Sequence, residues 1–155
     1  MISMANKEWS PAELKAKAEA YCAAAERCEY DVRLKLRQWN CYAVTADEIV
    51  DFLYSDGFLS VERYCRAFVH DKLLYQGWGR VKMEYALRMK HLPAPAIRDA
   101  LDTIDKIEYF RILNHLIDAK KKSFPEQADD AGNSLFRFLL QRGFTADEIR
   151  QALNG

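Results

Sequence analysis

The sequence predicts an all-α protein made of three tandem three-helix repeats, each similar to a helix-turn-helix. Apolar residues recur at the three- and four-residue spacing of helices through most of the 155 residues. The six glycines and four prolines fall between these segments rather than inside them. Matched apolar positions also return at a period of about fifty residues, which is typical of stacked supersecondary units. We therefore expect the repeats to form an elongated, curved array.

The first repeat is predicted to span residues 10–57, after an N-terminal tail of residues 1–9. Ser10, Pro11 and Glu13 begin a helix, because serine caps it, proline suits its first turn and the acid completes a capping box. A second helix is expected over 29–39 and a loop over 40–44. Thr45, with Glu48 three residues later, is expected to cap a third helix that closes near residue 57.

The second and third repeats are predicted to span residues 58–104 and 105–155. Ser60 is expected to cap the fourth helix, which ends at Gly77-Trp78-Gly79 because glycine adopts the left-handed conformation of helix ends. The remaining helices are expected over 80–90, 96–103, 105–122, 134–142 and 145–153. Pro93 and Pro95 are expected to break the chain, and residues 125–132 are the most linker-like segment.

The repeat is visible in the residues themselves. Thr-Ala-Asp-Glu-Ile occurs at 45–49 and again at 145–149. Two sets of apolar residues match when the repeats are aligned on isoleucine: Ile49, Ile97 and Ile149, and upstream Leu36, Leu87 and Leu139. The spacing from leucine to isoleucine is the same in repeats two and three, whereas repeat one has three more residues. We expect these extra residues to lie in its loop.

Composition and motifs exclude several classes of function. The formal net charge is zero, which disfavours a protein that mainly binds bare nucleic acid. No two of the four cysteines have the two-residue gap of zinc and redox sites, so buried free thiols are expected. The histidines stand apart, and no nucleophile has a base beside it. We therefore expect no catalytic residue, no metal and no cofactor, and we interpret the chain as a binding protein rather than an enzyme.

The sequence also lacks the pattern of a signal peptide and any apolar run long enough to cross a bilayer. A soluble, cytoplasmic protein is expected, with no membrane partner. Nothing in the sequence indicates an oligomer, so a monomer is expected.

Basic residues gather where a partner could contact them. Arg33 and Arg37 lie one helical turn apart, and Arg37 and Arg88 take the same place in their repeats. Trp78, held between two glycines, could stack on a base as well as pack in a core. The predicted partner- or DNA-binding residues are Arg33, Arg37, Trp78, Arg80, Lys82 and Arg88. A solvated charged face is the alternative interpretation of the same residues.

Several segments resemble the RecX family of bacterial recombination regulators. They are residues 28–36 (Cys-Glu-Tyr-Asp-Val-Arg-Leu-Lys-Leu), residues 56–59 (Asp-Gly-Phe-Leu) with 63–64 and 66–69, and residues 77–80 (Gly-Trp-Gly-Arg) leading into 85–92. One departure is Asn40, where the family commonly has a glycine. The resemblance implies tandem three-helix units that bind the RecA recombinase and lie in the groove of its filament on single-stranded DNA. It also implies that they suppress ATP hydrolysis, strand exchange and filament growth.

The main alternative is a stand-alone DNA-binding protein of helix-turn-helix type. Zero net charge and the absence of one clearly polar recognition helix argue against it. No motif in the sequence supports the interpretation as a hydrolase or a transferase. Whether the protein contacts single-stranded DNA directly stays open at this point.

Overall fold

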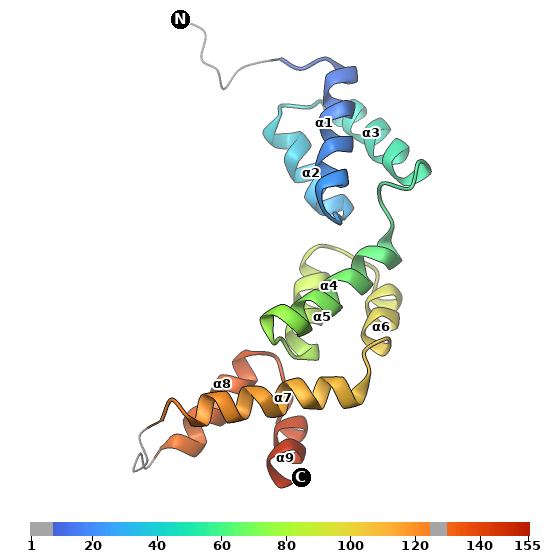
Figure 1. Cartoon of the computed structure of the whole chain (residues 1–155). Helices are drawn as coiled ribbons and strands as arrows, with labels where there is room; N and C mark the ends of the chain where they lie inside the picture. The colour runs from blue at the N-terminus through green and yellow to red at the C-terminus, as the bar shows by residue number, and fades with distance from the viewer. Residues whose placement is uncertain (1–7, 125–129) are drawn as a thin grey trace, which may run out of the picture. The chain divides into compact units, whose positions relative to one another are not determined.

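The computed structural model describes residues 8–124 and 130–155, and every regular element within these ranges is an α-helix (Figure 1). The fold class predicted from the sequence is therefore confirmed as all-α. The helices are α1 (Pro11–Ala24), α2 (Glu29–Gln38), α3 (Ala43–Ser55), α4 (Val61–Gln76), α5 (Arg80–Met89), α6 (Ala94–Asp102), α7 (Lys106–Lys121), α8 (Ala131–Gln141) and α9 (Ala146–Asn154). None of the helices described is long and apolar enough to span a membrane.

Several helices begin where the sequence predicts, because side chains there bond the free amides of the first turn. The Ser10 hydroxyl accepts a hydrogen bond from the Glu13 amide (3.1 Å), and the Glu13 carboxylate accepts one from the Ser10 amide (3.2 Å). Thr145 and Glu148 form the same capping box at the start of α9. The Ser60 hydroxyl likewise accepts an amide hydrogen bond in the first turn of α4. These three caps confirm the predicted starts of α1, α4 and α9.

The predicted start of α3 is wrong. The helix begins at Ala43, so Thr45 lies inside it and does not cap it. The N-cap is Tyr42, whose backbone is extended and whose side chain makes no capping hydrogen bond. The carbonyl of Tyr42 accepts the first helical bond, from the Ala46 amide (2.9 Å). A helix that begins without a side-chain cap has no capping motif in its sequence. The Thr45–Glu48 pair does resemble such a motif, and it therefore led to the wrong predicted start.

Two further helices begin earlier than predicted. Pro93 takes the extended N-cap conformation of α6, and Pro95 fits the first turn, where its missing amide is not needed. The prolines therefore start this helix rather than only interrupting the chain. Helix α8 begins at Ala131, so Gly132 is helical rather than part of a linker. Residues 125–129 of the predicted linker lie outside the described residues.

The turn before the last helix of each three-helix group has the same backbone geometry. A residue with positive φ follows a buried leucine by four positions, and the next amide donates to the carbonyl of that leucine. The equivalent trios are Leu36–Asn40–Cys41, Leu87–His91–Leu92 and Leu139–Gly143–Phe144, with φ of 57°, 61° and 100° at the middle residue. Asparagine tolerates the left-handed conformation better than most residues, so Asn40 can replace the glycine that the family commonly has there.

These turns correct the alignment of the repeats. The N-cap residues follow their leucines at one spacing in all three groups: Tyr42, Pro93 and Thr145. The first loop is therefore not longer, and the three extra residues appear only because Ile49 lies about one helical turn further from its N-cap than Ile97 and Ile149 do. Counted from the N-cap, Ala46 rather than Ile49 occupies the place of Ile97 and Ile149, and all of these side chains are buried. The two Thr-Ala-Asp-Glu-Ile segments thus occupy different positions in their helices.

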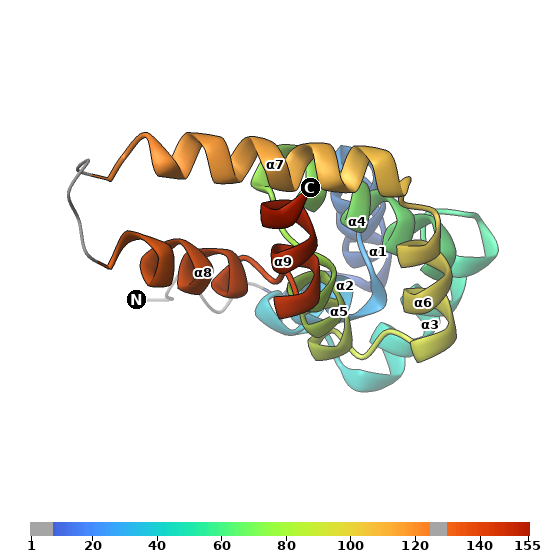
Figure 2. The same ribbon diagram turned by 90° about the horizontal axis from the view of Figure 1, so that it is seen from below.

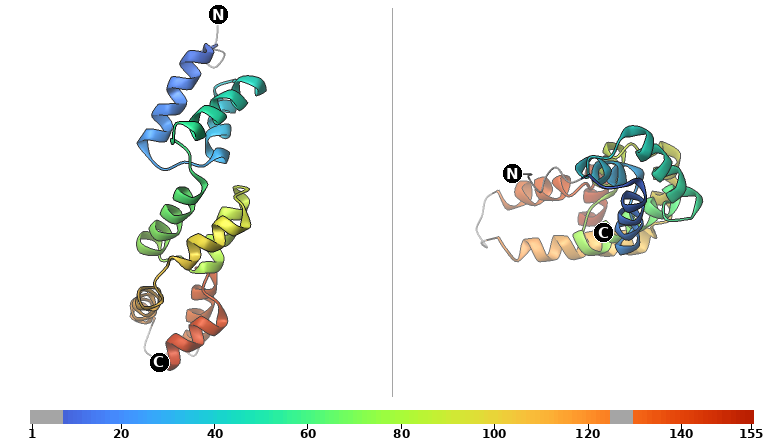
Figure 3. Two further views of the ribbon diagram at one scale, coloured as in Figure 1. Left: turned by 90° about the vertical axis from the view of Figure 1, so that its right-hand side faces the viewer. Right: turned by 90° about the horizontal axis from the view of Figure 1, so that it is seen from above.

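The chain divides into two compact units, the first ending at Tyr64 and the second beginning at Cys65. The first unit holds α1, α2 and α3, which lie together at the N-terminal end of the ribbon in Figure 3. These helices surround one apolar core. Its buried residues are Leu14, Ala18, Cys22, Val32, Leu36, Ala46, Ile49, Val50, Leu53 and Leu59. The i, i+4 spacing of Leu14, Ala18 and Cys22 places one stripe of α1 in this core.

The second unit holds most of α4 and all of α5 to α9. Helix α5 packs on α6, and α7 packs on both α8 and α9. Figure 2 shows α7 and α8 running side by side. The largest fully buried side chains of this unit are Val69, Leu73, Met83, Leu87, Ile97, Leu113, Leu139, Phe144 and Ile149. Because the division between units falls inside α4, the repeat boundaries at 57/58 and 104/105 stay a prediction.

Candidate partner-binding surfaces

Two glycine turns of the second unit lie against each other, and we call this contact the glycine junction. The Gly79 amide donates to the Arg142 carbonyl (2.8 Å), and the Val81 amide donates to the Gly143 carbonyl (3.0 Å). A Cβ on Gly79 would come closer than 3.0 Å to the backbone of Gly143, and one on Gly143 would crowd Lys82 as closely. The junction therefore requires glycine at both positions, and it fixes the α4–α5 turn against the α8–α9 turn.

Trp78 lies beside this junction among aromatic and basic side chains. Its half-buried ring packs edge-to-face on Phe68, with the ring centroids 6.2 Å apart. The Nζ of Lys72 lies 4.8 Å from the Trp78 ring centroid, and the Nζ of Lys82 lies 4.6 Å from it. Contacts of this kind are worth about 0.5–1 kcal/mol each at an exposed site. We call Phe68, Lys72, Trp78 and Lys82 the Trp78 cluster. It packs within its own unit and also places two ammonium groups beside an aromatic ring.

A second aromatic and basic group lies on α7 and α8, and the sequence analysis did not single out Phe138. The Nζ of Lys120 lies 4.6 Å from the Phe138 ring centroid, and the guanidinium carbon of Arg142 lies 5.2 Å from it. The Arg142 guanidinium also donates to the carbonyl of Gln76, the last residue of α4 (2.6 Å). Arg142 therefore links this group to the glycine junction. The i, i+4 spacing of Phe138 and Arg142 was the one signal in the sequence.

Arg80 has a structural role in addition to its predicted surface role. Its backbone amide donates to the Tyr109 hydroxyl (3.0 Å), and its guanidinium reaches the Leu101 carbonyl (3.4 Å) and the Asp102 carboxylate (3.7 Å). The buried Tyr109 hydroxyl donates in turn to Glu148 (3.1 Å). Burial raises the pKa of Tyr109 well above its usual value; the Arg80 amide opposes this and the Glu148 charge adds to it. Tyr109 thus joins α5, α7 and α9 through one hydroxyl.

The structure brings Trp78 and Lys82 together, while Arg88 stands on the last turn of α5. Arg88 pairs with Glu84 one turn earlier (2.8 Å) and keeps 62% of its side chain exposed. Such exposed pairs are worth about 0.3–0.5 kcal/mol, so Glu84 restrains Arg88 only weakly. Arg88 therefore stays accessible to a partner.

In the first unit, Arg33 and Arg37 differ in their surroundings. The Arg33 guanidinium donates to Glu29 (2.8 Å) and to Asp47 (2.9 Å), which ties α2 to the start of α3. The hydrogen bond to Glu29, and then that to Asp47, raises the pKa of Arg33. Arg37 is exposed and has no acidic partner among residues 8–124 and 130–155. Of these two predicted site residues, Arg37 is the freer to bind a partner.

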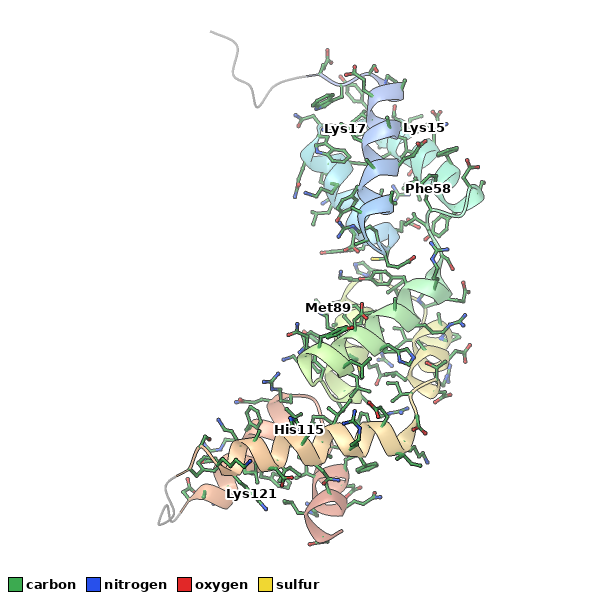
Figure 4. All side chains as sticks on the ribbon, viewed as in Figure 1. Lys15, Lys17, Phe58, Met89, His115 and Lys121 are labelled. Atoms are coloured by element: carbon green, nitrogen blue, oxygen red, sulfur yellow. The ribbon has the colours of Figure 1, made fainter. Side chains whose placement is uncertain are left out.

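Helix α1 carries a further group that the sequence analysis missed. The Nζ of Lys17 lies 3.9 Å from the Trp9 ring centroid and 4.7 Å from that of Trp39, so it lies close to both rings. The Nζ of Lys15 lies 3.5 Å from the Phe52 ring centroid. Figure 4 labels Lys15 and Lys17 on this helix. Packing alone brings Lys17 and Trp39 together, so their sequence positions gave no signal.

These groups can bind, and none has the arrangement of a metal centre. Within the described residues, no three His, Cys, Asp or Glu side chains are placed to hold a metal ion. None of the four cysteines forms a disulfide; Cys22, Cys28 and Cys65 are buried as predicted, whereas Cys41 is only half-buried. Burial raises the pKa of the Cys22 and Cys41 thiols, which lowers their reactivity. Lysine and arginine beside aromatic rings suit phosphates, carboxylates and bases.

The fold is that of an all-α helical-repeat protein, and its surface places lysine and arginine side chains beside aromatic rings. A family profile described as "RecX, second three-helix domain" matches residues 62–101. The regulatory protein RecX of Leptothrix cholodnii is 32% identical over 142 residues, which cover 90% of this chain and 87% of the relative. That of Chromobacterium violaceum is 31% identical over 134 residues, covering 83% of each chain. The chain therefore belongs to the RecX family of regulatory proteins.

Solved structures agree on the fold. The crystal structure of RecX from Lactobacillus salivarius has a TM-score of 0.80 over 93% of this chain and 94% of that chain, at 18% identity. A second structure, of a regulatory protein RecX, has a TM-score of 0.81 over 93% of this chain and 75% of the other. Some relatives are longer: the chain spans 60% of the RecX protein of Clostridium botulinum Eklund 17B, at 31% identity.

Proposed function

We propose that this protein regulates a RecA-type recombinase by binding the filament that the recombinase forms on single-stranded DNA. Binding would inhibit ATP hydrolysis, strand exchange and filament extension. The protein would act as a cytoplasmic monomer in DNA repair, recombination and the SOS response, without enzymatic activity of its own. The support for the general class is membership of a family whose curated members are regulatory proteins.

One observation carries the proposal furthest. The residues matched by the family profile, 62–101, include four of the six predicted site residues: Trp78, Arg80, Lys82 and Arg88. Two of them belong to the Trp78 cluster, and Arg88 is exposed on the same helix as Lys82. A nucleoprotein filament offers phosphates and carboxylates to such side chains. Direct contact with single-stranded DNA through the Trp78 cluster is part of the proposal.

The test is binding to preassembled filaments. A fluorescently labelled oligonucleotide coated with RecA and a non-hydrolysed nucleotide is titrated with the protein, and the same oligonucleotide without RecA is the control. We expect clearly tighter binding to the filament, and binding should weaken steeply as salt rises because charged groups dominate the contact. Equal affinity for filament and naked strand would contradict the proposal. Sequence-specific duplex binding without RecA would support the helix-turn-helix alternative instead.

A further inference from the structure

A hollow of about 400 Å³ opens beside the C-terminal end of α4 in the second unit. Three parts of the second unit line it: the end of α4 with Gly77, one side of α7, and Arg142 after α8. The lining residues of α4 are Leu73, Leu74, Tyr75 and Gln76, and those of α7 are Arg111, Ile112, His115 and Leu116. Figure 4 labels His115 on α7 beside this end of α4. The Arg142 guanidinium bonds the Gln76 carbonyl, and the glycine junction joins the turn after α4 to the turn after α8, so contacts within the fold connect these two parts of the lining.

The side chains around the hollow leave more apolar surface exposed than is usual for residues next to a core. Leu74 keeps 50% of its surface exposed and Tyr75 keeps 79%, although both follow the buried Leu73. Leu116 lies against the α4–α5 turn, because a Cβ on Gly77 would stand 3.2 Å from its side chain. Exposed apolar side chains around a hollow mark a place where a partner side chain can be buried.

The charge around the hollow has one sign. Arg111 and Arg142 are the charged side chains that line it, and none of the described residues lining it is acidic. The Arg142 guanidinium bonds the Gln76 carbonyl and so offsets the negative end of the α4 dipole. Arg111 pairs with Glu108 on the same helix, but Glu108 does not line the hollow and 65% of the Arg111 side chain stays exposed. The hollow is therefore complementary to carboxylates that flank an apolar group.

We infer that this hollow binds a short acidic segment of a partner protein. One aliphatic or aromatic anchor enters between Leu74 and Leu116, and carboxylates on either side of the anchor pair with Arg111 and Arg142. A peptide fits better than a nucleic acid because the apolar wall consists mostly of aliphatic side chains, on which a base does not stack, and Trp78 with its neighbouring lysines does not line the hollow. The aliphatic residues of this wall are Leu73, Leu74, Ile112 and Leu116. The residues that would bind the peptide all come from this chain, and this inference does not depend on the proposed action on RecA.

The test is an NMR titration of the isotope-labelled full chain with a synthetic peptide in which one leucine is flanked by aspartates. We expect amide shifts at residues 74–76, 112 and 115. A peptide with serine in place of the leucine should bind at least tenfold more weakly, and so should one with lysines in place of the aspartates. The double variant Tyr75→Ala, Arg111→Glu should also lose at least tenfold in affinity for the first peptide.

A matched double variant, Tyr85→Ala, Arg98→Glu, changes an exposed tyrosine and an exposed arginine away from the hollow and should bind the peptide as the parent does. Three outcomes would overturn the inference. The first is no shift at these amides with millimolar peptide. The second is equal loss of binding in both double variants. The third is a length-matched single-stranded oligonucleotide that shifts the same amides and displaces the peptide, which would make the hollow a nucleic-acid site.

Discussion

Gly79 packs directly on the backbone of Gly143, and neither position has room for a Cβ. Two backbone hydrogen bonds seal the contact, from Gly79 to Arg142 and from Val81 to Gly143. These turns lie more than sixty residues apart in the sequence. The contact fixes Trp78, Lys82 and Arg142 relative to one another, so the geometry of the candidate surface depends on it.

Replacing Gly79 with alanine should destabilise the protein. The added methyl group must displace the facing backbone, which costs about 1–3 kcal/mol, and each hydrogen bond weakened adds about 1 kcal/mol. Urea denaturation should show a lower free energy of unfolding. Gly132→Ala is the matched control, because Gly132 lies in α8 with nothing within 4 Å of its Cβ position. That variant should be unchanged or up to about 1 kcal/mol more stable. Equal effects at both positions would show that the junction is not tightly packed.

Reversing the charges of Arg37 and Arg88 together should weaken inhibition of RecA while leaving the fold intact. Both side chains are exposed, and Arg88 loses only the pair with Glu84, so stability should change by about 0.5 kcal/mol. Each reversal turns an attraction to the filament into a repulsion, and we expect about a tenfold loss of potency for the pair. The measurement is the concentration of protein that halves RecA-driven ATP hydrolysis.

The control for this pair is Glu48→Lys with Asp51→Lys on α3. Both acids are exposed, and unlike Asp47 they do not bond Arg33. If this control reduces inhibition as much as the arginine pair does, the surface that carries Arg37 and Arg88 is not the surface that binds the filament. If the arginine variant unfolds, the two arginines are structural.

Tyr109→Phe should destabilise the second unit by about 1–3 kcal/mol, since it removes a bond to the Glu148 carboxylate and leaves the Arg80 amide without its acceptor. Tyr85→Phe, at an exposed tyrosine, should have no effect in the same urea titration. An unchanged Tyr109→Phe variant would mean that water replaces the hydroxyl.

Tyr54 should make stability fall in strong alkali. Burial, and the Glu29 carboxylate that accepts its hydrogen bond, raise the pKa of Tyr54 to about 12 from an ordinary value of 10.0. The folded chain holds this proton more tightly than the unfolded chain does. The stabilisation is therefore present below about pH 10 and is lost as pH rises toward 12. Denaturation of the parent and of Tyr54→Phe should give free energies that converge over this interval; curves that stay parallel would contradict the assignment.

Much of the fold could be predicted from the sequence because helical periodicity is local. Leu36, Leu87 and Leu139 were matched by spacing and are all fully buried. The start of α3 could not be predicted, because its position follows from the left-handed turn at Asn40 and no side chain caps it. A five-residue identity with the start of α9 then favoured Thr45.

The candidate surface was less predictable because its contacts join distant parts of the chain. Trp78 and Lys82 are only four residues apart in the sequence, so their contact is local. The pairing of Arg33 with Asp47 depends on how α2 packs on α3, and the closeness of Lys17 to both Trp9 and Trp39 depends on how the helices of the first unit pack. The sequence alone therefore does not distinguish an arginine that is paired with acids, such as Arg33, from one without an acidic partner among the described residues, such as Arg37.

The most direct test of the central proposal is the rate of RecA-driven ATP hydrolysis on single-stranded DNA, measured as this protein is added. The protein should slow hydrolysis at concentrations at which it barely shifts the mobility of the same DNA without RecA. An unchanged rate, or inhibition only where the protein already coats naked DNA, would contradict regulation through the filament.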